Sequence, residues 1–202
     1  MTTQSCLSTR ASIRSLRSGS GQSIMEFALL MPLALVLALG VVEMGYALLD
    51  QHVVTKLARE GANLISRETP LPQAAQALAT MSTNPVNFTD GSSRLIFSVI
   101  KRGATTGTAN YNQMVLWQRY EYGSFPASSK LNGSGSFGPP EYTAPNSDNN
   151  TALRVTNLPG QLATVPGGMI FVAEIYTHHD LITPFDRLGV TVPSTLYSIA
   201  YF

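Results

Sequence analysis

Two short clusters in the sequence contain residue types that bind metal ions in other proteins. The first is His178-His179-Asp180, and the second is the Asp-Asn-Asn run at residues 148–150. Successive residues of a strand point to opposite faces, so two neighbouring histidines do not easily share one ion. The second cluster lacks the spaced oxygen ligands of a calcium loop. We therefore predict no metal site, and we interpret residues 178–180 as a strand end that runs into a polar turn.

The sequence also lacks the usual signatures of catalysis. It contains no G-x-S-x-G elbow, and its glycines follow neither the phosphate-loop nor the dinucleotide-binding pattern. Its single cysteine, Cys6, excludes an intramolecular disulfide and a cysteine-based zinc site. We therefore expect no cofactor and predict that the protein is not an enzyme.

Charge is distributed unevenly along the chain. The formal net charge is only +1, so no overall basic field indicates a nucleic-acid partner. Residues 1–21 contain Arg10, Arg14 and Arg17 and no acidic residue. All 12 acidic residues therefore lie after this short basic segment.

A carboxylate, Glu26, lies near the start of a long apolar run, within the block Gly21-Gln22-Ser23-Ile24-Met25-Glu26-Phe27. The 16 residues from Phe27 to Val42 carry no charge. Extending the run to residues 24–49 adds only Glu26 and Glu43, and it gives a helix of about 39 Å, enough to cross a hydrocarbon layer of about 30 Å. The two glutamates would then lie near opposite membrane faces. The arginines before the run predict a cytoplasmic N-terminus and an extracytoplasmic C-terminal part.

A secretory signal peptide is an alternative interpretation of the same region. Its apolar part would run from Phe27 to Ala38, and Ala38-Leu39-Gly40 would be a small-x-small cleavage site. The apolar character continues beyond Gly40 to Leu49 and passes into an amphipathic helical pattern, which a cleaved signal does not need. We therefore favour a retained membrane helix.

The remaining periodicities predict an α+β fold. A nearly continuous helix is expected from about Ile24 to Arg67, where Thr69-Pro70 stops it, and a second short helix is expected over residues 72–81. An antiparallel sheet of about five strands should pack on the upper half of the long helix. The last strand ends the chain, so its truncation should be harmful. The five predicted strands are residues 94–101, 112–122, 152–158, 169–178 and 195–202.

Residues 123–150 differ in composition from the rest of the C-terminal part. Eighteen of the 28 residues are Gly, Ser, Pro or Asn, which predicts a long flexible loop. A solvated, variable loop is favoured over a specific binding surface. Such a surface would be built from Phe125, Phe137, Tyr142 and the nearby Trp117.

The N-terminal pattern resembles the class III signal peptides of the type IV pilin superfamily. A basic leader, Gly21, four residues, then Glu26-Phe27 and "ALLMPL" are similar to the minor pilins and pseudopilins of the Tad (tight adherence) pilus, the TadE/TadF/TadG group. Three later segments resemble the same group: "LGVVEMGYAL" (39–48), "KLAREGANLIS" (56–66) and "FVAEIYTHHDLITPF" (171–185). The chain is too long for the major subunit of that system, and the segment that contains A-R-E-G-A favours the Tad group over a minor pseudopilin of type II secretion.

The resemblance implies a division of the chain into four parts. Residues 1–21 would be a cytoplasmic leader, which a prepilin peptidase cuts between Gly21 and Gln22. Residues 22–49 would be the transmembrane helix, residues 50–83 a helical extension with the second helix, and residues 84–202 the extracytoplasmic β-rich domain.

The resemblance also implies roles for three residues of the long helix. Glu26 and Phe27 would set the register of assembly, because the glutamate of this family is thought to meet the N-terminal amine of a neighbouring subunit. Glu43 would be a second contact residue of the helix.

The implied partners are the prepilin peptidase, other Tad pilins and pseudopilins, the inner-membrane assembly platform and the lipid bilayer, with no nucleic acid. The protein would be a single-pass protein of the inner membrane and would take part in pilus assembly and surface adhesion, either within the fibre or at the membrane. Alternatives are a membrane-anchored periplasmic binding module that is never assembled and an exported hydrolase with no recognisable motif.

Overall fold

The computed structural model describes residues 19–162, 164–183 and 194–202. The basic segment with Arg10, Arg14 and Arg17, and the last two residues of the 171–185 segment, lie outside the described residues. The chain divides into two units, Met1–Val41 and Val42–Phe202. Each unit is described by itself below.

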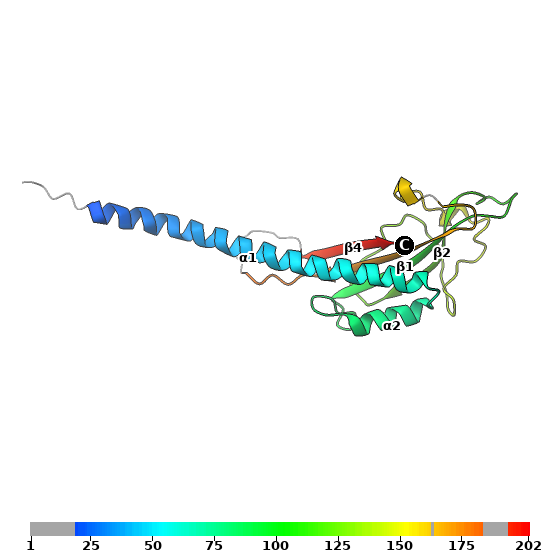
Figure 1. Ribbon diagram of the computed structural model, residues 1–202, viewed down its shortest axis with the longest axis horizontal. Helices are drawn as coiled ribbons and strands as arrows, with labels where there is room; N and C mark the ends of the chain where they lie inside the picture. Colours follow the sequence, from blue (N-terminus) through cyan, green and yellow to red (C-terminus); the bar gives the residue numbers. More distant parts are fainter. Residues whose placement is uncertain (1–18, 163, 184–193) are drawn as a thin grey trace, which may run out of the picture. The chain divides into compact units, whose positions relative to one another are not determined.

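The long helix, α1, runs from Gly19 to Ser66 and belongs to both units (Figure 1). The structure confirms the predicted helix, with a start five residues earlier and an end one residue earlier than expected. Pro32 lies inside it, as membrane helices tolerate. Residues 21–38 are all exposed, although most are apolar. An apolar surface of this extent requires lipid or neighbouring helices to cover it.

The second helix, α2, runs from Leu71 to Met81. Pro70 is its N-cap residue, and a second proline follows within the first turn, where the missing N–H has no helical partner to lose. Its buried side chains recur at helical spacing and pack into the main core of the second unit. They are Leu71, Ala74, Ala75 and Leu78.

Four antiparallel strands form one sheet with the order β2-β1-β3-β4. The strands are β1 (Ser93–Arg102), β2 (Met114–Tyr122), β3 (Met169–His178) and β4 (Thr195–Tyr201). The predicted α+β class with an antiparallel sheet is confirmed, but among the described residues the sheet has four strands and not five. The C-terminal strand β4 pairs with β3 along its whole length, as its apolar sequence predicts.

The predicted strand at residues 152–158 is wrong. Residues Thr151–Leu153 form a short 3-10 helix, η1, because the Asn150 side chain accepts a hydrogen bond from the backbone N–H of Ala152 and turns the chain. Only a single bridge, between Arg154 and Val115, joins this segment to β2. Its alternating apolar side chains are buried against the sheet without forming a strand of it. A second 3-10 helix, η2, follows at Gly160–Leu162.

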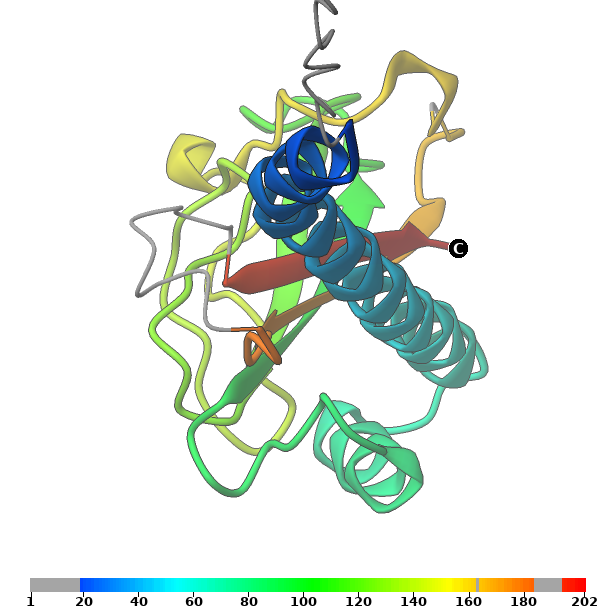
Figure 2. The ribbon, with the colours of Figure 1, turned by 90° about the vertical axis from the view of Figure 1, so that its left-hand side faces the viewer.

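The two faces of the sheet are covered by different parts of the chain (Figure 2). The upper turns of α1 and all of α2 cover one face. Gly61 lies where α1 approaches the sheet most closely, because a Cβ there would be 3.0 Å from Phe97 Cε1 and 3.3 Å from the Cβ of Ala173. The core on this face includes Val54, Leu57, Ala58, Ile65, Leu95, Phe97 and Ile175.

The other face is covered by the segment between β2 and β3. Leu131 and Val155 from this segment pack with Ile100, Leu116 and Val172 of the sheet. The four aromatic residues proposed for a binding surface in this region are half-buried. Two of them pack against the main core, and Tyr142 also makes an edge contact with Tyr120 at 4.7 Å between ring centroids. Because the segment is rich in Gly and Ser, which have small side chains, its backbone can lie close to the sheet surface.

Candidate functional site

The predicted cleavage region lies in the first turns of α1. A Cβ added at Gly21 would meet no atom within 4 Å beyond its chain neighbours and the adjacent backbone of the same helix. The Gln22 side-chain amide donates a hydrogen bond of 3.0 Å to Glu26 Oε1, one helical turn away. Glu26 and Phe27 are both exposed. The N-terminal nitrogen that a cut after Gly21 would create therefore belongs to a residue whose side chain already contacts the Glu26 carboxylate.

Glu43 occupies a different environment from Glu26. Its side chain is almost completely buried, although the sequence predicts a position at the outer membrane face. One carboxylate oxygen accepts hydrogen bonds from the backbone N–H of Thr183 at 2.9 Å and from its hydroxyl at 2.6 Å. The other accepts a longer bond of 3.4 Å from the N–H of Ile182. Glu43 thus holds the chain that follows β3 against α1.

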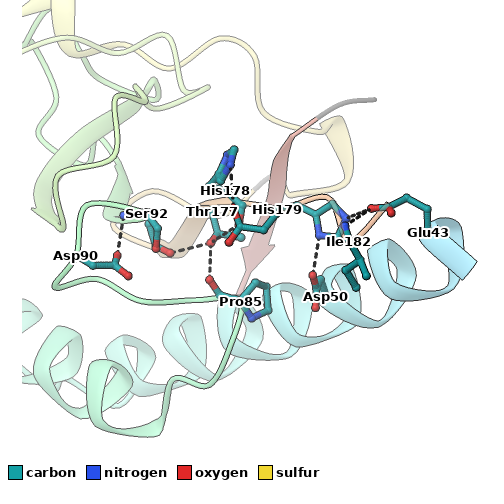
Figure 3. Close-up of polar contacts among 11 residues, drawn as sticks. Glu43, Asp50, Pro85, Asp90, Ser92, Thr177, His178, His179 and Ile182 are labelled. Carbon is teal, nitrogen blue, oxygen red and sulfur yellow. Dashed lines mark hydrogen bonds and ion pairs between the residues drawn. The ribbon is translucent and has the colours of Figure 1, made fainter. Parts of the chain in front are cut away.

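His179 lies between two carboxylates of α1 (Figure 3). Its Nδ1 atom is 2.7 Å from Asp50 Oδ2, and its Nε2 atom is 3.4 Å from Glu43 Oε1. The side chain is 1% exposed, and the His179 backbone N–H donates to the carbonyl of Ser194 at 2.7 Å. We call Glu43, Asp50, His179 and Thr183 the helix–loop clamp.

Local geometry explains why these residues meet. Glu43 and Asp50 are seven residues apart, which is two helical turns, so they project from the same face of α1. At the end of β3, His178 is partly exposed, 3.3 Å from Asp180, whereas His179 turns inward. The sequence correctly placed the two histidines on opposite sides. Within the described residues, no group of three or more His, Cys, Asp or Glu side chains is arranged to hold a metal ion.

Most of the clamp is not predicted by the sequence. Glu43 is predicted to be a contact residue of the helix, but that prediction does not connect it with Asp50, His179 or Thr183. A spacing of seven between two acids on one helical face was the available signal. Their partners lie more than 120 residues later in the chain, and only the antiparallel path of β3 brings them back to α1.

A second buried carboxylate, Glu174, fixes the segment after β2 to the other face of the sheet. Glu174 is fully buried and accepts hydrogen bonds from the Ser129 hydroxyl, from the Lys130 N–H at 2.8 Å and from the Tyr197 hydroxyl at 3.0 Å. The Tyr176 hydroxyl donates to the carbonyl of Ser128 at 2.8 Å. This cluster is an anchor that holds the segment on the sheet.

Burial and charge change the acidity of groups around Glu174. Burial raises the pKa of the Tyr197 and Tyr176 hydroxyls well above the usual value, and the nearby Glu174 carboxylate raises it further. Burial lowers the pKa of Arg119, and Glu174 partly opposes that effect. The Arg119 guanidinium donates to the Ser129 hydroxyl at 3.1 Å and so supports the same contact.

These features define an α+β protein with one apolar N-terminal helix, whose upper turns pack on an antiparallel sheet. That helix is long and apolar enough to cross a membrane, which is consistent with a membrane anchor. The family model described as TadE-like protein matches residues 21–63, from the predicted cleavage glycine to the segment that contains A-R-E-G-A. Over this segment the chain is similar to the TadE-like proteins, which confirms the resemblance and supports a pilin-like protein of a Tad pilus. No curated protein and no solved structure matches the chain.

Proposed function

We propose that the protein is a minor pilin or pseudopilin of a Tad-type (type IVc) pilus that takes part in pilus assembly and surface adhesion. The observation that supports this most is the TadE-like match, which begins at Gly21, in the first turn of the exposed apolar helix α1. The N-terminus would be cytoplasmic and the Val42–Phe202 unit mainly extracytoplasmic. In this role the protein is a structural subunit and not an enzyme. Its partners are the prepilin peptidase, other Tad pilins and the inner-membrane assembly platform.

In this proposal, cleavage between Gly21 and Gln22 creates the charge that assembly uses. The new α-amine on Gln22 would pair with the Glu26 carboxylate of a neighbouring subunit when the helix leaves the lipid. A buried ion pair adds little net stability, but a lone buried charge costs several kcal/mol, so wrong registers are disfavoured. Phe27, exposed beside Glu26, would pack in the same contact.

Substitution of Gly21 tests the cleavage assignment directly. We expect Gly21→Ala to leave a larger, membrane-bound precursor, detected as a slower band in gel electrophoresis. Gly45→Ala is a matched control, because it is also a glycine of α1 with open space around it. Normal processing of Gly21→Ala would refute the assignment.

Substitution of Glu26 separates assembly from cleavage. Glu26→Gln should be cleaved normally but should be depleted in sheared surface fractions, whereas Glu60→Gln on the same helix should not. Mass spectrometry of the mature N-terminus shows whether Gln22 keeps a free amine or cyclises to pyroglutamate. Wild-type amounts of Glu26→Gln in the surface fraction would contradict the register role.

A membrane-anchored binding module remains the second candidate. An open groove of about 580 Å³ favours it, and its lining includes Trp117, Phe171, Glu68 and Glu141. A lining of aromatic side chains with a few polar groups is typical of ligand sites. An uncleaved leader, together with complete retention in the inner membrane, would favour this candidate over a pilin.

A further inference from the structure

The exposed apolar surface of α1 continues past Val41 into the second unit, Val42–Phe202, which we call the folded unit. Glu43 faces the loop after β3, but the other sides of the same two helical turns are exposed and apolar. Gly45 and Ala47 complete these turns, and only Glu43 and Asp50 interrupt them with charge. The exposed apolar side chains are Val42, Met44, Tyr46, Leu48 and Leu49.

Ile182 adds an apolar side chain to this surface from the loop. Its backbone N–H contacts Glu43, so the loop lies beside the first of these turns (Figure 3). Ile182 is 58% exposed, although Thr183 beside it is buried against Glu43. We call Ile182 and the five exposed apolar residues of α1 between positions 42 and 49 the foot of the folded unit.

The length of the apolar helix indicates where the foot lies relative to lipid. Residues 22–49 measure about 42 Å along a helix axis, whereas the hydrocarbon core is about 30 Å thick and the bilayer with its headgroup layers about 40–45 Å. If residues 22–41 cross the hydrocarbon, the first turn of the foot and Ile182 beside it fall in the outer headgroup layer, which is about 5–8 Å thick, and Leu49 lies at or beyond the outer edge of that layer. Tyr46 suits this layer, because its ring is apolar and its hydroxyl is polar.

The helix–loop clamp is consistent with the same depth. A carboxylate at the edge of the hydrocarbon is costly unless protein groups satisfy it. Glu43 is satisfied by the loop itself, through Thr183 and Ile182, and it is 3% exposed. The folded unit would therefore carry its own cover for the charged face of α1 into the interface.

We propose that the foot is a lipid-binding surface: the 181–183 loop lies at the boundary between headgroups and acyl chains, with Ile182 inserted into the lipid. This inference rests on the membrane anchoring in the proposed function. The occupant is the bilayer, because the foot is continuous along α1 with the segment that crosses it.

Tryptophan fluorescence in vesicles tests the proposal. The chain has one tryptophan, so Trp117→Phe gives a silent background for single reporters. The full chain, reconstituted in phospholipid vesicles with acyl chains brominated near the headgroup, would carry Ile182→Trp as the reporter. Leu37→Trp, within the helix, is the positive control, and Val165→Trp, 72% exposed on the folded unit, is the negative control. Met44→Trp, in the first turn of the foot and 70% exposed, reports independently on the helix side.

We expect the brominated lipid to quench Ile182→Trp and Met44→Trp strongly and to leave Val165→Trp unchanged. If Leu37→Trp is not quenched, the membrane anchoring itself fails. If Leu37→Trp is quenched but Ile182→Trp is not, only the foot proposal fails. Iodide then identifies the reason: quenching by iodide places the loop in water, and protection from both quenchers places another protein on it.

Discussion

Removal of the Glu43 side chain should release the loop after β3 while leaving the sheet intact. In Glu43→Ala, the N–H and hydroxyl of Thr183 lose the acceptor that they reach at 2.9 and 2.6 Å. The third bond, from Ile182 at 3.4 Å, is long and should contribute little. The His179 ring would also lose one of the two carboxylates beside it.

The size of the effect follows from the two short bonds. A hydrogen bond to a charged group contributes about 1.5–3 kcal/mol, so the loss of both should destabilise the local contact by about 3 kcal/mol or more. A difference of 1.4 kcal/mol is tenfold in an equilibrium constant, so protection of the Thr183 amide should fall about 100-fold. Glu43→Gln keeps one acceptor oxygen, which can still accept both Thr183 bonds, but it loses the charge and replaces the other oxygen with an NH2 group, so we expect a fall of about fivefold.

Hydrogen exchange followed by mass spectrometry measures this protection on the full chain in lipid nanodiscs. Peptides that cover residues 179–183 should exchange faster in Glu43→Ala, and peptides from β1 should not change. Glu60→Ala on the same helix controls for the loss of a glutamate. Unchanged protection of the Thr183 amide in Glu43→Ala would refute the view that this carboxylate holds the loop.

Three further predictions concern the folded unit. Gly61→Val should lower the midpoint of thermal unfolding, because overpacking against Phe97 costs about 1–3 kcal/mol. Gly61→Ala should be nearly neutral, because the gain in helix propensity offsets the tight fit. Equal midpoints for the wild-type protein and both variants would contradict the close approach of α1 to the sheet. Glu174→Ala should expose the 123–135 segment to limited proteolysis, because Lys130 and Tyr197 lose their acceptor; an unchanged cleavage pattern would count against an anchoring role. The raised pKa values of Tyr176 and Tyr197 mean that the folded state binds these protons more tightly, so their contribution to stability is present below pH about 10 and is lost as pH rises further. An alkaline titration by ultraviolet absorbance should show two of the eight tyrosines ionising only on unfolding, and ionisation of all eight near pH 10 would contradict this expectation.

Elements with a strong local pattern could be predicted from the sequence. The helical period and the apolar composition marked α1 to within a few residues of Gly19 and Ser66. The alternation of apolar residues identified β1, β3 and β4 nearly to their ends. The segment 152–158 has the same alternation but is no strand, since the turn made by Asn150 and burial against the sheet satisfy its residues without a ladder.

The candidate site also contains a part that the local sequence predicts and a part that it does not. The spacing of Gly21, Glu26 and the apolar run is a contiguous signal, and the TadE-like match begins at the same glycine. For Glu43, in contrast, the sequence predicts a position at the membrane surface, because its charge is visible in the sequence but its partners are not. The position of Ile182 beside the Glu43 turn was equally hidden.

The sequence by itself determined the features that depend on neighbours along the chain: the apolar helix, its glutamate near the start, the α+β class and most of the strands. Only the tertiary structure decided which groups the buried charges contact. Glu43 meets Thr183 across 140 positions, and Glu174 meets Lys130 across 44. Periodicity reports which face of an element is apolar, whereas such pairs depend on how the elements fold back on one another.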